Sequence, residues 1–89
     1  MSNLAESIAT YIPFPNIAFR TAIYFGNLSI KQYEKEYVLD SSSGFLLRRA
    51  KEQLELAQAV LEHRFPLDWK KADSLYQSWK RFEKYYYNL

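Results

Sequence analysis

The residues best suited to chemistry lie in the C-terminal segment, where basic side chains alternate with aromatic rings. Residues 69–89 contain five basic and two acidic residues, so this segment carries a net charge of +3 and the rest of the +2 chain nets −1. Cations neutralise phosphates and rings stack on unpaired bases, which is the chemistry of single-stranded nucleic-acid binding. The candidate nucleic-acid contacts are Lys70, Lys71, Lys80, Arg81, Lys84 and Tyr86.

The same segment has a structural interpretation. On a helix, the rings of Trp69, Trp79, Phe82 and Tyr86 would point toward a core, and the basic residues would form the solvated side, with their stems covering ring edges. A net charge of only +2 also gives the chain a weak long-range attraction for a polyanion. Nucleic-acid binding is therefore the alternative function and not the leading one.

Residue types that support catalysis are scarce. The chain has no cysteine and a single histidine, His63, which excludes disulfide scaffolds, thiol chemistry and histidine pairs. Gly26 and Gly44 are isolated, so no phosphate-binding glycine loop is present. The serines at 41–43 fall in a loop, and His63 falls in the last turn of a predicted helix, where it favours the helix dipole. We expect a non-enzyme with no catalytic residue, metal or cofactor.

The number of aromatic rings is high for so short a chain, with eight Tyr, six Phe and two Trp among 89 residues. Three consecutive tyrosines, residues 85–87, fan across about 200° of a helix and cannot share one inner face. Tyr24 and Phe25 are adjacent and raise the same problem. Clustered rings outside a core usually mark the surface that a partner covers.

The leading hypothesis is a small helical protein-interaction module of the adaptor, assembly-factor or inhibitor type. It would act by occupying a protein partner or a second copy of itself, as a homodimer or larger oligomer, since burial of an ordinary dimer surface would also stabilise so short a chain. The candidate partner-binding residues are Tyr24, Phe25, Trp79, Arg81, Lys84, Tyr85, Tyr86 and Tyr87.

The chain length of 89 residues predicts one domain, residues 1–89, with a small core. Residues 1–10 contain no basic residue, unlike a secretory signal. The most apolar stretch, residues 11–30, is interrupted by prolines and by Arg20, so it predicts a buried or interfacial helix and no membrane span. We expect a soluble, intracellular, cytoplasmic protein; peripheral membrane association through residues 11–30 is a third and weaker hypothesis.

The positions of apolar residues and helix breakers predict an all-α fold, a small bundle of three to four helices. The predicted helices are 4–12, 17–39, 45–65 and 69–87, separated by Pro13 and Pro15, by the loop 40–44 and by Pro66. Asp68 is the predicted cap of the last helix, and the short linker before it predicts a C-terminal antiparallel hairpin. Residues 17–39 fit one kinked helix or two helices broken near 26–28.

Apolar stripes predict which side of each helix faces the core. The stripe of the first helix consists of Leu4, Ile8 and Tyr11 or Ile12. That of the third consists of Leu46 or Leu47, Ala50, Leu54, Ala57 and Val60 or Leu61, and its spacing continues to Arg64. That of the last consists of Trp69, Ala72, Leu75 or Tyr76, Trp79, Phe82 and Tyr86.

Overall fold

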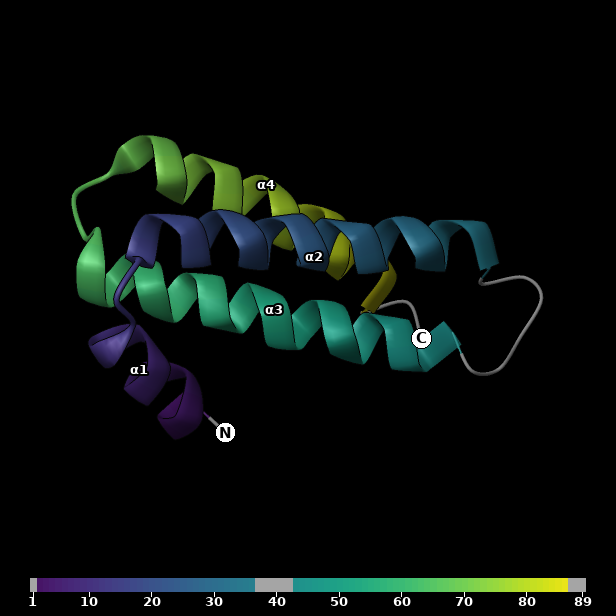
Figure 1. Ribbon diagram of the computed structural model, residues 1–89. Helices are drawn as coiled ribbons and strands as arrows, with labels where there is room; N and C mark the ends of the chain where they lie inside the picture. Colours follow the sequence, from purple (N-terminus) through teal and green to yellow (C-terminus); the bar gives the residue numbers. More distant parts are fainter. Residues whose placement is uncertain (1, 37–42, 87–89) are drawn as a thin grey trace.

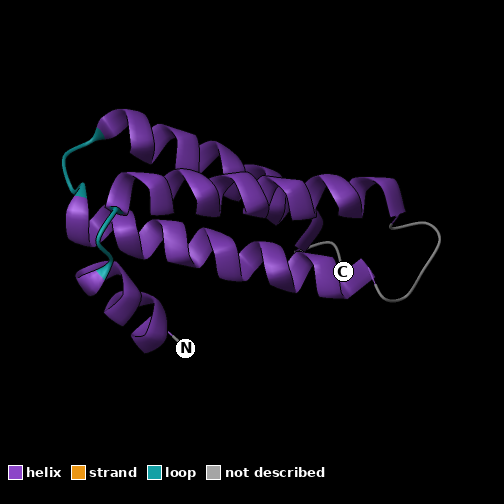
Figure 2. Ribbon diagram, viewed as in Figure 1, coloured by secondary structure: helices purple, strands orange, loops and turns teal. Residues whose placement is uncertain are grey.

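The computed structural model describes residues 2–36 and 43–86, and these ranges fold into four helices. They are α1 (Ser2–Tyr11), α2 (Pro15–Glu36), α3 (Ser43–Arg64) and α4 (Trp69–Tyr86). Figure 1 shows α2, α3 and α4 lying alongside one another with alternating direction, while α1 crosses one end of α3. No strand occurs within the described ranges (Figure 2), and the predicted all-α bundle is confirmed. The short turn from α3 to α4 fits the predicted C-terminal hairpin.

Helix α2 runs unbroken through Gly26 and Asn27, which decides between the two interpretations of this segment in favour of one helix. Gly26 is buried against α3, and a Cβ atom added to it would lie 2.9 Å from Cδ2 of Leu54. The absence of a side chain at Gly26 therefore allows α2 and α3 to approach closely, and the glycine does not end α2. Ala22 and Ala50, both at most 1% exposed, are small residues buried in the same core.

The core lies mainly between α2 and α3, and α1 and α4 cover its two sides. Helix α4 contributes Leu75 and Phe82, whereas Ala9 is the one fully buried residue among residues 4–11 of α1. The buried apolar residues are Ala9, Phe19, Ala22, Ile30, Tyr33, Leu47, Ala50, Leu54, Ala57, Ala59, Val60, Leu75 and Phe82. The predicted apolar positions of α3 are present in this set, whereas Arg64, the last position of the predicted spacing, is exposed.

The helices begin at positions that a capping residue and a proline help to explain. Asp68 caps α4 as predicted, since its Oδ1 accepts a hydrogen bond from the backbone N–H of Lys71 at 3.0 Å. Helix α2 begins at Pro15, two residues earlier than predicted, because a proline at the first helical position has no N–H to leave unsatisfied. Helix α3 begins at Ser43, so Ser43 and Gly44 are helical and not part of the predicted loop. Residues 37–42 lie outside the described residues.

Helix α1 buries a different side from the predicted one. Leu4 and Tyr11 are 70% and 83% exposed, and the residues that pack inward are Ala5 and Ala9. Small side chains let the backbone of α1 lie close to α3, and the larger residues of α1 then face outward. The predicted stripe of Leu4, Ile8 and Tyr11 is therefore wrong for this helix.

The predicted stripe of α4 is wrong in its first part. Trp69 is 72% exposed and Ala72 is also exposed, whereas Leu75, one of the two alternatives at 75–76, and Phe82 are buried. Ten residues separate Trp69 from Trp79, which at about 100° per residue leaves their side chains roughly 80° apart around the helix. Helix α4 begins at Trp69, at the end of the bundle where α3 ends and α2 begins (Figure 1).

Candidate functional site

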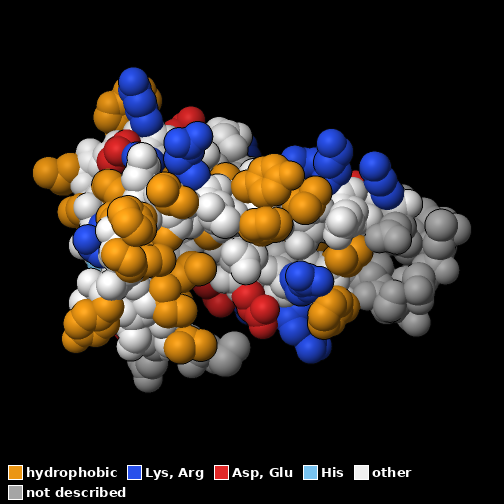
Figure 3. Space-filling view, viewed as in Figure 1, with side chains coloured by type: hydrophobic (Ala, Val, Ile, Leu, Met, Phe, Trp, Pro, Cys, Tyr) orange, Lys and Arg blue, Asp and Glu red, His pale blue; other side chains and the backbone are white. Residues whose placement is uncertain are grey.

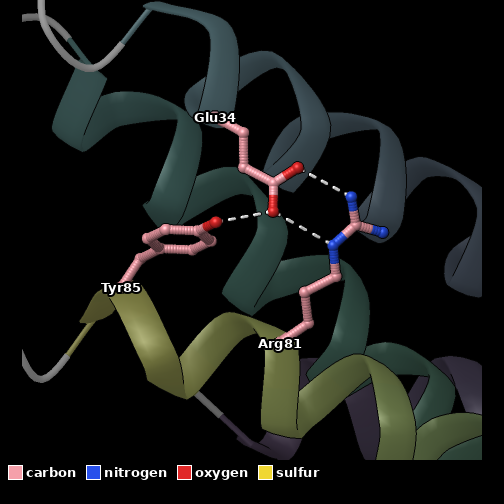
Figure 4. Close-up of polar contacts among 3 residues, drawn as sticks. All are labelled: Glu34, Arg81 and Tyr85. Atoms are coloured by element: carbon pink, nitrogen blue, oxygen red, sulfur yellow. Dashed lines mark hydrogen bonds and ion pairs between the residues drawn. The ribbon is translucent and has the colours of Figure 1, made fainter.

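Two of the candidate contact residues on α4 converge on one carboxylate of α2, Glu34 (Figure 4). Arg81 donates from Nη2 to Oε1 of Glu34 at 2.7 Å and from Nε to Oε2 at 3.2 Å, a bidentate arrangement. Tyr85 donates its hydroxyl to Oε2 of the same carboxylate at 2.7 Å. These contacts tie the C-terminal half of α4 to α2, and nothing in the sequence marked Glu34 as their acceptor.

The hydrogen bonds from Arg81 and then from Tyr85 lower the pKa of Glu34 below its ordinary value of 4.5. The same contact with Glu34 raises the pKa of Arg81. Both groups are therefore charged near neutral pH. Because the ion pair is partly open to solvent, with side-chain exposures of 42% and 28% for Arg81 and Glu34, it contributes no more than about 1 kcal/mol to folding.

The stability that Glu34 confers is expected to depend on pH in one direction. Its pKa is lower in the folded chain, so the contribution is fully present above pH 4.5 and is lost as the pH falls through the folded value. Urea unfolding of the Glu34→Gln variant should show a deficit against the native chain at pH 7 that shrinks below pH 4.5. The Glu83→Gln variant is the matched control on α4, and a deficit that stays constant down to pH 3 would contradict the assignment.

The remaining rings of α4 pack onto the bundle. Phe82 stacks on Tyr86 with centroids 5.0 Å apart and meets Trp79 edge-on at 5.5 Å. Tyr85 contacts Tyr33 of α2 at 5.3 Å. Trp79, Tyr85 and Tyr86 are half-buried, since α4 lies over both α2 and α3 and can place rings on more than one side. Lys84 lies over the Tyr85 ring, and Tyr87 lies outside the described residues.

Tyr24 and Phe25, the two candidate residues on α2, form an exposed apolar pair. Their rings meet edge-on with centroids 5.1 Å apart, and the residues are 60% and 46% exposed. Gly26 faces α3, and at about 100° per residue Tyr24 points to nearly the opposite side of α2. Figure 3 shows apolar side chains gathered over the middle of this helix. This is the part of the predicted contact surface that the described residues leave open.

Two surface depressions of about 390 Å³ each flank this pair and share Phe25 as a wall. We call them together the α2 groove. Its lining residues are Ile17, Arg20, Thr21, Tyr24, Phe25, Leu28, Ser29, Gln32, Arg49 and Gln53. The lining combines apolar side chains with two arginines and contains no carboxylate.

No family model, curated protein or solved structure matches this chain. Its function is therefore inferred from the chemistry of its surface.

A second group of exposed apolar residues, at one end of the bundle, is not among the predicted contact residues. There the connection from α1 to α2 lies beside the turn from α3 to α4 (Figure 1), and Arg64 of α3 donates from Nη1 to the carbonyl oxygen of Ile12 at 2.9 Å. Phe14 and Leu67, in these two connections, are 67% and 93% exposed. The available signal was the presence of large apolar side chains inside turns, next to prolines.

The basic residues of α4 are partly engaged by neighbours. Lys71 pairs with Asp68 at 3.2 Å and Arg81 pairs with Glu34, so two of the five cations meet a carboxylate. Lys70 and Lys80 lie over the rings of Trp69 and Tyr76. These contacts weaken the positive field that nucleic-acid binding through α4 would use.

Within residues 2–36 and 43–86, no group of three or more His, Cys, Asp or Glu side chains is placed to hold a metal ion. Over the same ranges, none of the helices has the combined length and apolar character needed to cross a membrane.

Proposed function

We propose that this protein is a small non-catalytic interaction module that binds a protein partner through the exposed aromatic residues of α2. The observation that carries the proposal is the exposed pair of Tyr24 and Phe25 at the middle of a long helix. An aromatic side chain offers about 150–250 Å² of surface to a partner, and removing such surface from water is worth about 25 cal/mol per Å². Contiguous exposed rings therefore favour association.

The rigidity of α2 supports the same proposal. Ala22, Gly26, Ile30 and Tyr33 anchor its inner side in the core, so the outer side is held in one conformation before any partner arrives. A preorganised surface loses less conformational entropy on binding than a loop does. Tyr85 and Tyr86, the described candidate tyrosines of α4, differ because they already pack against the core.

A double variant, Tyr24→Ala with Phe25→Ala, tests the proposal. We expect it to fold with an unchanged melting temperature, because both side chains are exposed, and to lose binding by at least tenfold. Binding is measured as light-scattering mass at high micromolar concentration and as recovery of a partner from the native source. The matched control is Tyr76→Ala, which removes an exposed ring from α4. A native chain that stays monomeric and recovers no partner, or binding that survives the double variant, would overturn the proposal.

A further inference from the structure

The α2 groove is long enough to accommodate a helix of about four turns. Its lining runs along α2 from Ile17 to Gln32, a distance of about 22 Å at 1.5 Å per residue, or about four helical turns. Tyr24, Phe25 and Leu28 line its middle. Four of the ten lining residues are apolar, namely Ile17, Tyr24, Phe25 and Leu28. A surface stripe of this length can pack against the apolar side of an amphipathic helix, whose residues at i, i+3, i+4 and i+7 share one face.

The charged residues that line the groove have one sign. Arg20 lies in one depression and Arg49 in the other, and neither forms an ion pair within the described residues. Lys31 and Lys35 are exposed on the same helix. Helix α2 contains two glutamates, and Glu34, the one whose side chain is described, does not line the groove and is already held by Arg81 and Tyr85. The groove therefore offers two arginines with no carboxylate in its lining.

The separation of the two arginines can be estimated from the crossing of α2 and α3. Gly26 faces Gln53 and Leu54, and the two helices run in opposite directions (Figure 1). Arg20 lies six residues, or about 9 Å, to one side of this crossing, and Arg49 lies about 7 Å to the other. The arginines are thus about 16 Å apart along the groove, which is about three turns of a helix.

We infer that the α2 groove binds an amphipathic helix of a partner protein that carries two acidic residues about three turns apart. The inference rests on the proposed function and names the chemistry of its partner. The apolar side of that helix covers Tyr24, Phe25 and Leu28, and its carboxylates pair with Arg20 and Arg49.

Other occupants fit the groove less well. A two-fold pairing of two copies through their grooves would place Arg20 of one copy against Arg20 or Arg49 of the other, and like charges oppose association. A head-to-tail copy could offer Glu55 and Glu62 from α3, but the apolar side of α3 is buried in its own core. A nucleic-acid strand requires a row of cations, and two arginines about 16 Å apart do not follow a phosphate backbone.

Three synthetic helical peptides test the inference with the full chain. Each has 18 residues and the same leucine stripe, and they differ only at two positions eleven residues apart, which carry Glu, Gln or Lys. Fluorescence anisotropy at low salt should show the Glu peptide binding about tenfold more tightly than the Lys peptide, with the Gln peptide between them. Added salt should shrink this difference.

Reversing the two charges in the groove provides a second test of the inference. The variant Arg20→Glu with Arg49→Glu should fold normally by circular dichroism and should reverse the order, so that the Lys peptide binds most tightly. The matched control, Lys70→Glu with Lys80→Glu, makes the same charge change on α4 and should leave the order unchanged.

The outcomes separate this inference from the proposed function. Equal binding of the three peptides, no binding of the Glu peptide, or an order that survives charge reversal would overturn the inference. If the chain self-associates through Tyr24 and Phe25 and excludes the Glu peptide, the occupant is a second copy and only the inference fails. In the other case, the Tyr24→Ala, Phe25→Ala double variant keeps every association of the native chain at full strength. The proposed function then fails together with the inference.

Discussion

Replacing Gly26 by leucine should destabilise the bundle by about 3 kcal/mol, a large part of the roughly 5–10 kcal/mol that holds a domain of this size together. A Cβ atom at this position would lie 2.9 Å from Cδ2 and 3.3 Å from Cγ of Leu54. Leu54 is fully buried, so its side chain has no open space into which to move. Accommodating the new side chain requires α2 and α3 to separate along their contact.

Gly44 provides a matched control for the same substitution. It lies near the start of α3, and a Cβ atom added there meets nothing within 4 Å. Leucine has a helix propensity about 0.8 kcal/mol better than glycine, so Gly44→Leu should leave the chain as stable or slightly more stable. Urea unfolding of both variants at pH 7 gives the comparison. Equal loss of stability in the two variants would show that Gly26 does not set the distance between α2 and α3.

Gly26 also illustrates what a single sequence conveys. Glycine followed by asparagine is a common helix end, and the sequence left open whether residues 17–39 formed one helix or two. What decides the matter is the presence of Leu54 on another helix, 28 positions away in the chain. Local propensity could give the helical class and the approximate boundaries, but a close approach between two helices depends on residues far apart in sequence.

The candidate contact residues also divide into those whose exposure follows from a local rule and those whose contacts depend on the tertiary fold. Adjacent rings on a helix cannot share one side, and this local rule correctly anticipates that Tyr24 and Phe25 are exposed. The rule does not say how many neighbours surround a helix. Helix α4 meets both α2 and α3, so Tyr85 reaches Glu34 and Tyr86 stacks on Phe82. Exposure at Phe14 and Leu67 follows from which turns meet at one end of the bundle, and this is a property of the tertiary fold.

Replacing Arg64 by leucine should release α1 from the bundle. Arg64 donates from Nη1 to the carbonyl oxygens of Ala9 at 3.2 Å and Ile12 at 2.9 Å, which lie at the C-terminal end of α1. Carbonyl groups in the last turn of a helix have no partner within the helix, and the guanidinium supplies one together with a favourable charge. Hydrogen bonds from a charged group are worth about 1.5–3 kcal/mol each.

Helix α1 has little else to hold it in place. Of its side chains, Ala9 is fully buried and Ala5 is partly buried, whereas Leu4 and Tyr11 face outward. Burial of two methyl groups and of part of Ile8, which is 39% exposed, contributes about 2–3 kcal/mol, so the contacts of Arg64 form a large share of the docking energy of this helix.

Hydrogen exchange reports this release directly. In the Arg64→Leu variant, the amides of α1 should exchange at least tenfold faster, while the buried amides of α2 and α3 keep their protection because their core does not include the arginine. Arg48→Leu is the matched control, since it removes an exposed arginine from the same helix and leaves Ala9 and Ile12 bonded to Arg64. Unchanged protection of α1 would show that the packing of Ala5 and Ala9 is enough to hold this helix against the bundle. A loss of protection across all four helices would show instead that Arg64 supports the whole bundle.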